Sequence, residues 1–242
     1  MERKEKIFVG TVRKLFNDFV DNQQLVCNGD KVLCAISGGK DSMALLHLLA
    51  HRKKYLNPDF YLVAVYVHVE NAAYSIERQL VEDFCESIDV PFVYNPIILN
   101  DLRNGENRCF ICSTARRSAL FSMARKLGCN KIAFGHNMDD VVETFLLNSI
   151  FHGRNETFKP KTILFDGEIT LVRPLMNVSK LQTAHYSEVY NFPKTKTPCG
   201  FENISMRYEV RKMLDSLNNL TPAATKNLYK VACTYMQSVN NP

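Results

Sequence analysis

The sequence predicts an α/β protein built around a doubly wound, Rossmann-like and mostly parallel sheet. Short apolar stretches alternate along the chain with longer stretches whose apolar residues recur at helical spacing. One apolar stretch, residues 31–36, runs directly into the string from Ser37 to Ser42, where two adjacent glycines come before a helical segment. Ligands of such sheets bind beyond the carboxyl ends of the strands, so a binding site is expected at this turn.

Strands and helices alternate through the first 100 residues. An N-terminal helix is predicted because apolar residues recur at helical spacing from Ile7 to Val20. Three short apolar strands follow, and the second is rich in Val and Tyr, which favour sheets. The predicted elements are helices over 7–20, 42–49 and 76–88 and strands over 31–36, 60–69 and 91–99.

The rest of the chain adds a fourth strand, a hairpin and several helices. Gly128 is expected to end one helix, and Asp166-Gly167 predicts the turn of the hairpin. The predicted elements are helices over 110–127, 139–150, 179–190, 204–217 and 222–239, a strand over 131–135 and the hairpin over 162–172. We therefore expect a nucleotide-binding and catalytic domain over 1–190, which includes the N-terminal helix. Residues 191–242 would form a cysteine-bearing loop and a helical appendage, or belong to the same domain.

The composition excludes several classes of protein. The 242 residues are 46% apolar and 23% charged, which suits one large folded domain and argues against disorder. No apolar run reaches the roughly 20 residues of a membrane span, and no apolar signal segment follows the charged N-terminus. We therefore expect a cytoplasmic protein whose eight cysteines form no disulfide framework. The net charge of +5 is compatible with RNA binding.

The string from Ser37 to Ser42 has the features of a phosphate cradle. Its two glycines let the backbone turn sharply and approach a ligand closely, and N–H groups at the start of the next helix attract anions. Lys40 adds a positive charge, and the two serines add hydroxyl donors. The string is not the phosphate loop of kinases and GTPases. Cys34 stands where that motif needs glycine, and Asp41 stands where it needs Ser or Thr.

A second polar string, from Gly135 to Asp140, lies between the fourth strand and the next helix. Asp139 and Asp140 fall in the first helical turn, where acids complement the helix dipole without any catalytic role. Two adjacent carboxylates that face a triphosphate would repel it unless Mg²⁺ intervenes, and hard oxygen ligands suit Mg²⁺. We favour Asp140 as the catalytic or metal-linked acid, with Asp139 second.

Cys109 and Cys112 lie one helical turn apart at the start of a predicted helix, with Arg116 one turn further on. Such a pair could be a redox dithiol, part of a zinc site, or part of a 4Fe-4S cluster held by three cysteines. Cys199 lies in a loop-like stretch between proline and glycine, where a core role explains it poorly. By contrast, Cys34 and Cys85 lie in apolar patterns and are expected to pack in the core.

Together these motifs resemble a known family. The string from Ser37 to Ser42 resembles the PP-loop of the adenine nucleotide alpha-hydrolase-like superfamily, and Gly-His-Asn-x-Asp-Asp over 135–140 resembles its second signature. Cys-x-x-Cys-Ser-x-x-Arg-Arg over 109–117 resembles the tRNA 2-thiocytidine synthetase branch. Further matches to that branch are Asn28-Gly29-Asp30, Arg173-Pro174-Leu175, Pro198-Cys199-Gly200 and Arg207. The chain departs from the branch at Lys196, where a further cysteine would stand.

The resemblance implies an enzyme that splits ATP between its α- and β-phosphates and adenylates a substrate oxygen. It implies ATP with Mg²⁺, a cytidine C2 position in the tRNA anticodon loop as target, and a 4Fe-4S cluster on Cys109, Cys112 and Cys199. The implied partners are tRNA and a sulfur donor such as a cysteine desulfurase, and a homodimer is compatible with them. Implied catalytic residues are Lys40, Asp41, Arg116 and Asp140, and implied nucleotide-binding residues are Ser37, Gly38, Gly39, Lys40, Asp41, Ser42, His68, Gly135 and Asp139.

Two alternative functions stay open at this point. A PP-loop enzyme could adenylate its substrate and attack it with an amine, as a lysidine synthetase or an amidotransferase does, but this leaves the three cysteines without a role. A non-catalytic nucleotide-sensing or RNA-binding module would bind ATP without releasing pyrophosphate. Because Lys196 replaces the further cysteine, the exact target nucleotide and the sulfur donor also stay open.

Overall fold

The structure, a computed structural model, describes residues 2–56, 58–72, 75–99, 108–194 and 206–240. Its centre is a six-stranded sheet with the strand order β3-β2-β1-β4-β6-β5. The strands are β1 (Lys31–Ile36), β2 (Tyr61–Val69), β3 (Phe92–Ile97), β4 (Lys131–Ala133), β5 (Lys161–Leu164) and β6 (Ile169–Val172). Only β5 and β6 pair antiparallel, and all other neighbours are parallel. The predicted doubly wound, mostly parallel sheet is therefore confirmed.

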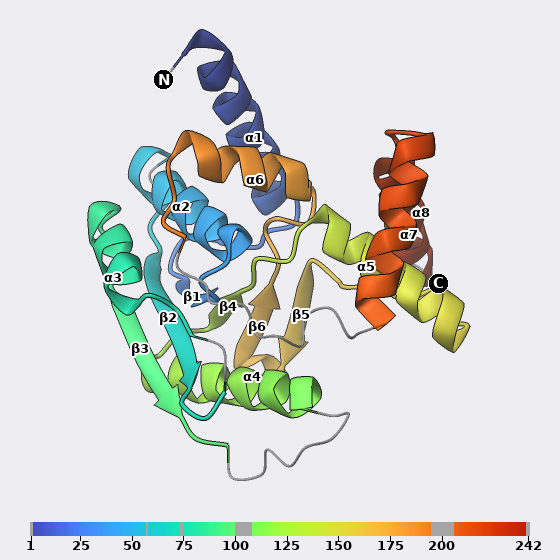
Figure 1. The fold of residues 1–242 in the computed structure, drawn as a ribbon. Coiled ribbons are helices and arrows are strands. Elements are labelled where there is room, and N and C mark those ends of the chain that lie inside the picture. The colour runs from blue at the N-terminus through green and yellow to red at the C-terminus, as the bar shows by residue number, and fades with distance from the viewer. Residues whose placement is uncertain (1, 57, 73–74, 100–107, 195–205, 241–242) are drawn as a thin grey trace.

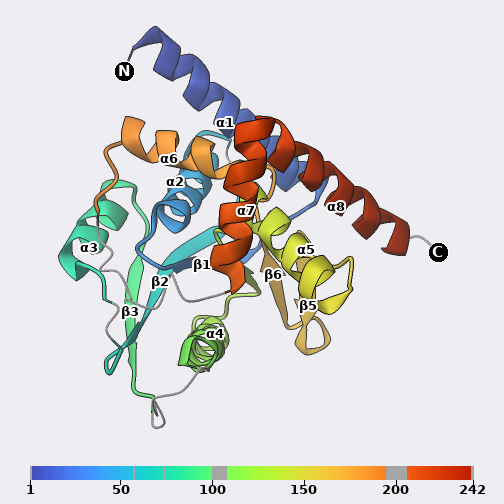
Figure 2. The same cartoon turned by 45° about the vertical axis from the view of Figure 1, so that its right-hand side comes forward.

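Helices cover both faces of this sheet (Figure 1). Four helices lie on one face, namely α1 (Arg3–Asn22), α2 (Lys40–Tyr55), α3 (Arg78–Ser87) and α6 (Lys180–Val189). The other face is covered by α4 (Arg108–Lys126). A third group lies beside the β6–β5 end of the sheet and is seen best in Figure 2: α5 (Met138–His152), α7 (Met206–Leu220) and α8 (Ala224–Asn240). Extra helices at both ends of the chain were predicted and are confirmed.

Two apolar cores lie on opposite faces of the sheet because side chains alternate along each strand. In β1, Val32, Cys34 and Ile36 belong to the core beneath α1, α2 and α6, whereas Leu33 belongs to the core beneath α4. Cys85 of α3 joins Cys34 in the first core, so the packing role predicted for these two cysteines is confirmed. Burial raises the pKa of the Cys85 thiol to about 12, which keeps it protonated.

The helix that follows the glycine turn, α2, is buried on nearly every side. Its buried residues include Met43, Leu45, Leu46, Leu48 and Leu49, which cover more than one helical face. A helix with apolar residues all round is stable only when it is enclosed, and here the sheet lies on one side and α1 and α6 lie on the other. The N-terminus of α2 is therefore held in a fixed position.

Differences from the predicted elements are small and local. The fourth strand ends at Ala133 instead of residue 135, because the chain turns away from the sheet, although the Phe134 N–H still donates to the Val172 carbonyl. The hairpin between β5 and β6 turns through Phe165, Asp166 and Gly167, all with positive φ, so the turn predicted from Asp-Gly is confirmed. The division of the chain at residue 190 stays a prediction.

A buried ion pair joins the amino ends of β1 and β4. Lys131 Nζ lies 2.6 Å from Asp30 Oδ2, and both side chains are only about one tenth exposed. The Asp30 carboxylate also accepts hydrogen bonds from the Cys27 N–H at 2.6 Å and from the Asn130 side chain at 2.9 Å. Asn130 in turn accepts a bond from the Lys31 N–H, so this cluster fixes the position of both strand starts.

No helix in the described part of the chain combines the length and the apolar character that crossing a membrane requires.

The buried pair yields a prediction about stability. Replacing Asp30→Asn leaves the Lys131 ammonium buried without its counter-charge, so we expect the free energy of unfolding to fall by about 3 kcal/mol. Urea denaturation followed by circular dichroism measures this change. The control is Asp18→Asn, which breaks the exposed Lys14–Asp18 pair on α1 and should cost less than about 0.5 kcal/mol. Equal losses in the two variants would contradict the structural role given to the buried pair.

Candidate functional site

A cavity of about 360 Å³ opens beyond the carboxyl ends of the central strands. Three segments that are far apart in the sequence line it: the glycine turn with the start of α2, the segment after β4, and one face of α4. The polar residues around it are Ser37, Asp41, Ser42, Ser113, Arg116, Arg117 and His136. Because ligands of such sheets bind beyond the carboxyl ends of the strands, the sequence predicted Ser37, His68 and His136 at one edge of the sheet. The structure brings Ser37 and His136 to one cavity together with a face of α4, and His68 is not among its lining residues.

The glycine turn is organised by the hydroxyl of Ser42. Ser42 Oγ donates to the Gly39 carbonyl at 2.9 Å and accepts from the Ser37 N–H at 3.1 Å. Gly38 has a φ of 72°, a left-handed conformation that favours glycine over any residue with a side chain. The turn leads into the N-terminus of α2, where backbone N–H groups point out of the helix and attract anions. This geometry suits the phosphates of a nucleotide.

The segment after β4 packs directly against this turn. A methyl group added to Gly135 would lie 3.1 Å from backbone atoms of both Asp41 and Ser42. Such a contact is tighter than most real side-chain contacts, so a side chain here would require the backbone of the turn to shift slightly. Gly135 therefore lets the segment after β4 pack closely against the glycine turn. Its role in nucleotide binding stays a prediction.

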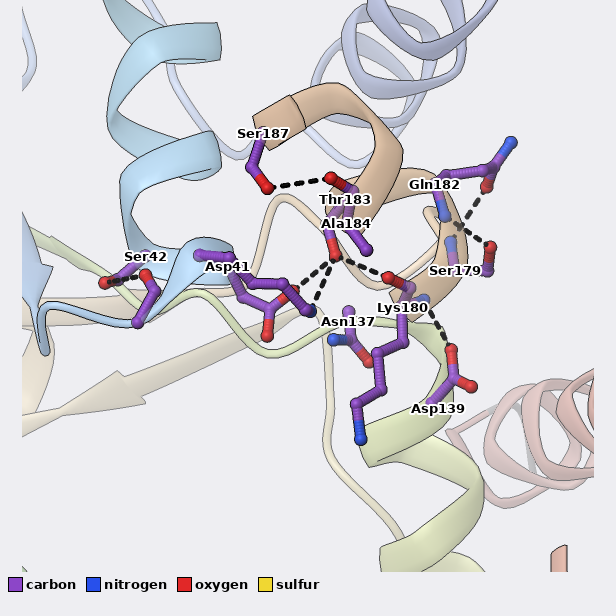
Figure 3. A network of polar contacts seen from close by, with 12 residues as sticks. Asp41, Ser42, Asn137, Asp139, Ser179, Lys180, Gln182, Thr183, Ala184 and Ser187 are labelled. Atoms are coloured by element: carbon purple, nitrogen blue, oxygen red, sulfur yellow. Dashed lines mark hydrogen bonds and ion pairs between the residues drawn. The ribbon is translucent and has the colours of Figure 1, made fainter. Parts of the chain in front are cut away.

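Lys40 and Asp41 form an ion pair at the start of α2. Lys40 Nζ donates to Asp41 Oδ1 at 2.7 Å and to Thr183 Oγ1 at 3.2 Å, and the Thr183 hydroxyl donates to the same Asp41 oxygen. Figure 3 shows Asp41 and Thr183 meeting between α2 and α6. Asp41 lines the cavity, whereas Lys40 is not among its lining residues. Thr183 lies far along the chain, and no sequence signal pointed to it.

The two acids of the second motif build the start of α5. The Asn137 side chain accepts from the Asp140 N–H at 3.1 Å, and Asp140 Oδ2 accepts from the Asn137 N–H at 3.0 Å, which forms a capping box. Asp139 Oδ2 accepts from the Lys180 N–H at 2.7 Å and so links α5 to α6. Neither acid is among the residues that line the cavity. Both carboxylates therefore have a capping or linking contact in addition to any chemical role.

Burial controls the charge of these acids. The pKa of Asp140 is raised to about 6, chiefly by burial. A backbone hydrogen bond from Asn137 opposes this rise, the nearby Glu143 and Asp41 carboxylates add to it, and Arg207 opposes it. Burial also raises the pKa of Asp139. The carboxylate oxygens of Asp139 and Asp140 are of the hard kind that a divalent cation prefers.

His136 forms part of the cavity wall and is kept neutral. Its ring stacks on Phe158 with the centroids 4.5 Å apart. Burial, together with the positive charges of Arg173, Arg207 and Arg117, lowers the pKa of His136 to about 3. The site therefore contains several guanidinium groups beside an uncharged imidazole. The sequence marks His136 only as part of the second motif, with no role of its own.

The cysteine pair lies on the first turns of α4, one turn before residues that line the cavity. Cys109 is exposed and Cys112 is partly buried, and both are free thiols. Ser113 and Arg116 follow Cys112 on the side of the helix that faces the cavity. Cys199 lies outside the described residues. Within the described part of the chain, no three potential ligands of the His, Cys, Asp and Glu types are grouped as a metal site.

His68 lies at the end of β2 but is not among the residues that line this cavity. Its ring stacks on Tyr94 of β3 with the centroids 5.4 Å apart. Its Nδ1 is buried and has no hydrogen bond to any residue that the structure describes. The nucleotide-binding role of His68 stays a prediction.

Helix α7 contacts the start of α5 through two arginines. Arg211 of α7 forms a two-pronged ion pair with the buried Glu143 of α5, at 2.7 and 3.0 Å. One turn earlier, Arg207 donates to Thr144 at 3.1 Å. Residues 195–205, which contain Cys199, come directly before α7. These contacts fix the start of α7 beside the acid-bearing end of α5.

Comparisons with known proteins agree with this geometry. The sequence model of the PP-loop domain family matches residues 7–219. A tRNA-cytidine(32) 2-sulfurtransferase from Anaeromyxobacter sp. (strain K) is 34% identical over 94% of this chain and 78% of its own length. The protein of the same name from Nitrosospira multiformis is 31% identical over 90% of this chain and 74% of its own length.

A solved structure has a similar fold. The U34-tRNA thiolase NcsA from Methanococcus maripaludis, determined with its 4Fe-4S cluster, superposes with a TM-score of 0.76 at 22% identity. The match covers 95% of this chain and 79% of the thiolase. The motifs, the fold and the length of the matches lead to one assignment. The chain belongs to the PP-loop domain family, in the branch that contains these curated sulfurtransferase relatives.

Proposed function

We propose that this chain is an ATP-dependent tRNA sulfurtransferase that replaces the C2 oxygen of a cytidine in the anticodon loop with sulfur. One observation carries the proposal: a single cavity is lined on one side by the phosphate-cradling turn and on the other by the helix that begins with Cys109 and Cys112. The phosphate-cradling turn and the helix that carries both thiols therefore share one cavity, although the thiols lie one helical turn before its lining residues. The curated relatives at 31–34% identity carry the name of this activity.

The first half of the reaction activates the base. The cytidine carbonyl oxygen attacks the α-phosphorus of ATP, a new oxygen–phosphorus bond forms, and pyrophosphate leaves with the electron pair of the broken bond. The turn from Ser37 to Ser42 would hold the departing phosphates with its backbone N–H groups and hydroxyls. Asp41, which lines the cavity, and Asp140 behind it have the hard oxygen donors that would hold Mg²⁺.

The second half requires sulfur at the other side of the cavity. Cys109 and Cys112 lie three residues apart on a helix, a spacing that points two soft thiolate donors in the same direction, as a metal cluster requires. The donor set therefore fits a 4Fe-4S cluster, with Cys199 as the third ligand. Bound there, the cluster would supply sulfide at an iron that no protein ligand occupies.

Two cavity residues suit the displacement of AMP. Arg116 and Arg117 bring positive charge to the cavity wall, which stabilises the negative charge that develops when sulfur adds to C2 and AMP leaves. The neutral His136 beside them can exchange a hydrogen bond with the base without adding charge. Proposed partners are the tRNA, a sulfur donor such as a cysteine desulfurase, and a second copy of the chain in a homodimer.

The function is tested in cells that lack this gene. We expect 2-thiocytidine to disappear from their tRNA and to return when the wild-type protein is expressed, as measured by mass spectrometry of tRNA nucleosides. Cys112→Ser should restore less than about one hundredth of the wild-type level, because serine is a hard ligand that does not replace thiolate. The control is Cys27→Ser, which alters an exposed thiol away from the cavity and should restore the full level. Unchanged 2-thiocytidine in the deletion strain would disprove the proposed function.

Gly135 lies close to the glycine turn from Ser37 to Ser42, called the phosphate turn from here on. This close approach gives a second prediction. Gly135→Ala forces a methyl group against the backbone of Asp41 and Ser42, so the turn must shift. We expect the dissociation constant for ATP, measured by isothermal titration calorimetry, to rise about tenfold, which corresponds to about 1.4 kcal/mol. Gly10→Ala on α1 is the matched control, because its methyl group meets no atom within 4 Å. An unchanged affinity in Gly135→Ala would contradict the steric argument.

A further inference from the structure

Thr183 is the most buried polar group that contacts the phosphate turn, and the proposed mechanism has not used it. Its side chain is only 1% exposed, yet it lies at the boundary between α6 and the first turn of α2. The Thr183 hydroxyl donates to Asp41 Oδ1 and accepts from Lys40 Nζ at 3.2 Å. The hydroxyl also lies 3.0 Å from the Lys180 carbonyl oxygen of its own helix. A threonine in a helix has two main rotamers, and in this one the hydroxyl is directed toward the start of α2.

Both contacts of the Asp41 carboxylate fall on the same oxygen. Lys40 Nζ and the Thr183 hydroxyl reach Oδ1, and within the described part of the chain no hydrogen bond reaches Oδ2. A carboxylate bound through one oxygen by two donors cannot rotate freely. Asp41 lines the cavity, and its Oδ2 is the oxygen that these two donors leave available to a ligand.

The helix that carries Thr183 is itself anchored to the second acidic motif. Ser179 caps α6 and forms a capping box with Gln182, and the Lys180 N–H donates to Asp139 at 2.7 Å. The first turn of α6 therefore contacts the start of α2 and the start of α5 at the same time, as Figure 3 shows. It bridges the two motifs that flank the cavity.

We infer that Thr183 is a positioning residue of the nucleotide site, whose hydroxyl holds Asp41 Oδ1 so that Oδ2 is presented to the magnesium ion of bound MgATP. The inference rests on the proposed function only in that ATP binds at the phosphate turn. Without the hydroxyl, Asp41 can rotate, and its negative charge can face the phosphates directly, where the two repel each other. The hydroxyl also shares the binding of the Lys40 ammonium and so fixes the direction of that charge.

The test compares two substitutions at one position. Thr183→Val keeps the shape of the side chain and removes the hydroxyl, whereas Thr183→Ser keeps the hydroxyl. The dissociation constant for a non-hydrolysable ATP analogue is measured by calorimetry over a series of Mg²⁺ concentrations. We expect Thr183→Val to weaken binding about tenfold and to raise the Mg²⁺ concentration needed for half-maximal binding several-fold. Thr183→Ser should stay within about threefold of the wild type in both quantities.

The matched control is Ser187→Ala on the same helix. The Ser187 hydroxyl donates to the Ala184 carbonyl of its own helix at 2.7 Å and does not contact the phosphate turn. We expect wild-type binding and wild-type Mg²⁺ dependence in this variant. Thermal unfolding of all three variants separates positioning from folding, because a purely structural role lowers the melting temperature without changing the Mg²⁺ dependence.

The possible outcomes test this inference separately from the proposed function. Wild-type Mg²⁺ dependence in Thr183→Val, or an equal change in Ser187→Ala, overturns the positioning role, whatever the result for tRNA. Because the assay measures nucleotide binding alone, it does not depend on thiolation. A protein that shows the expected Mg²⁺ shift but makes no 2-thiocytidine would retain the positioning role of Thr183 and lose the sulfur-transfer proposal.

Discussion

The enclosure of α2 is the constraint on which the rest of the site depends. Leucines and methionine on several faces of this helix are buried between the sheet and the helices α1 and α6. A helix held on all sides cannot shift along its axis without opening the core. Its N-terminus, and with it the turn from Ser37 to Ser42, therefore keeps one position relative to β1 and β4. The chemistry of the turn is local, but its placement comes from the burial of apolar residues that never touch a ligand.

Much of this arrangement could be predicted because it depends on local sequence. Strands and helices alternate with clear periodicity, and the glycine turn and the capping acids carry their own signals at short range. Parallel strands then bring the loops that follow them to one edge of the sheet. A binding site at the glycine turn was therefore expected from the sequence. The order of the strands and the place of α4 beside that turn became known only from the structure.

Contacts between distant segments could not be predicted in the same way. Thr183 is separated from Asp41 by 142 positions, and a threonine in an amphipathic helix carries no signal of its partner. The steric demand at Gly135 likewise depends on the backbone of another element. The capping role of Asp140 was visible only in part, because the sequence placed it in a first helical turn without showing its bond to Asn137. In each case the sequence does not show which residues lie close together in the folded chain.

The buried pair of Asp30 and Lys131 lies at the amino ends of β1 and β4, while the phosphate turn lies beyond the carboxyl end of β1. A strand of six residues spans roughly 20 Å, and sites so far apart contribute almost additively to the free energy. The buried pair that stabilises the fold therefore lies at one edge of the sheet, and the cavity lies at the other. A substitution near the cavity should therefore change the free energy of unfolding by the same amount whether or not the buried pair is intact.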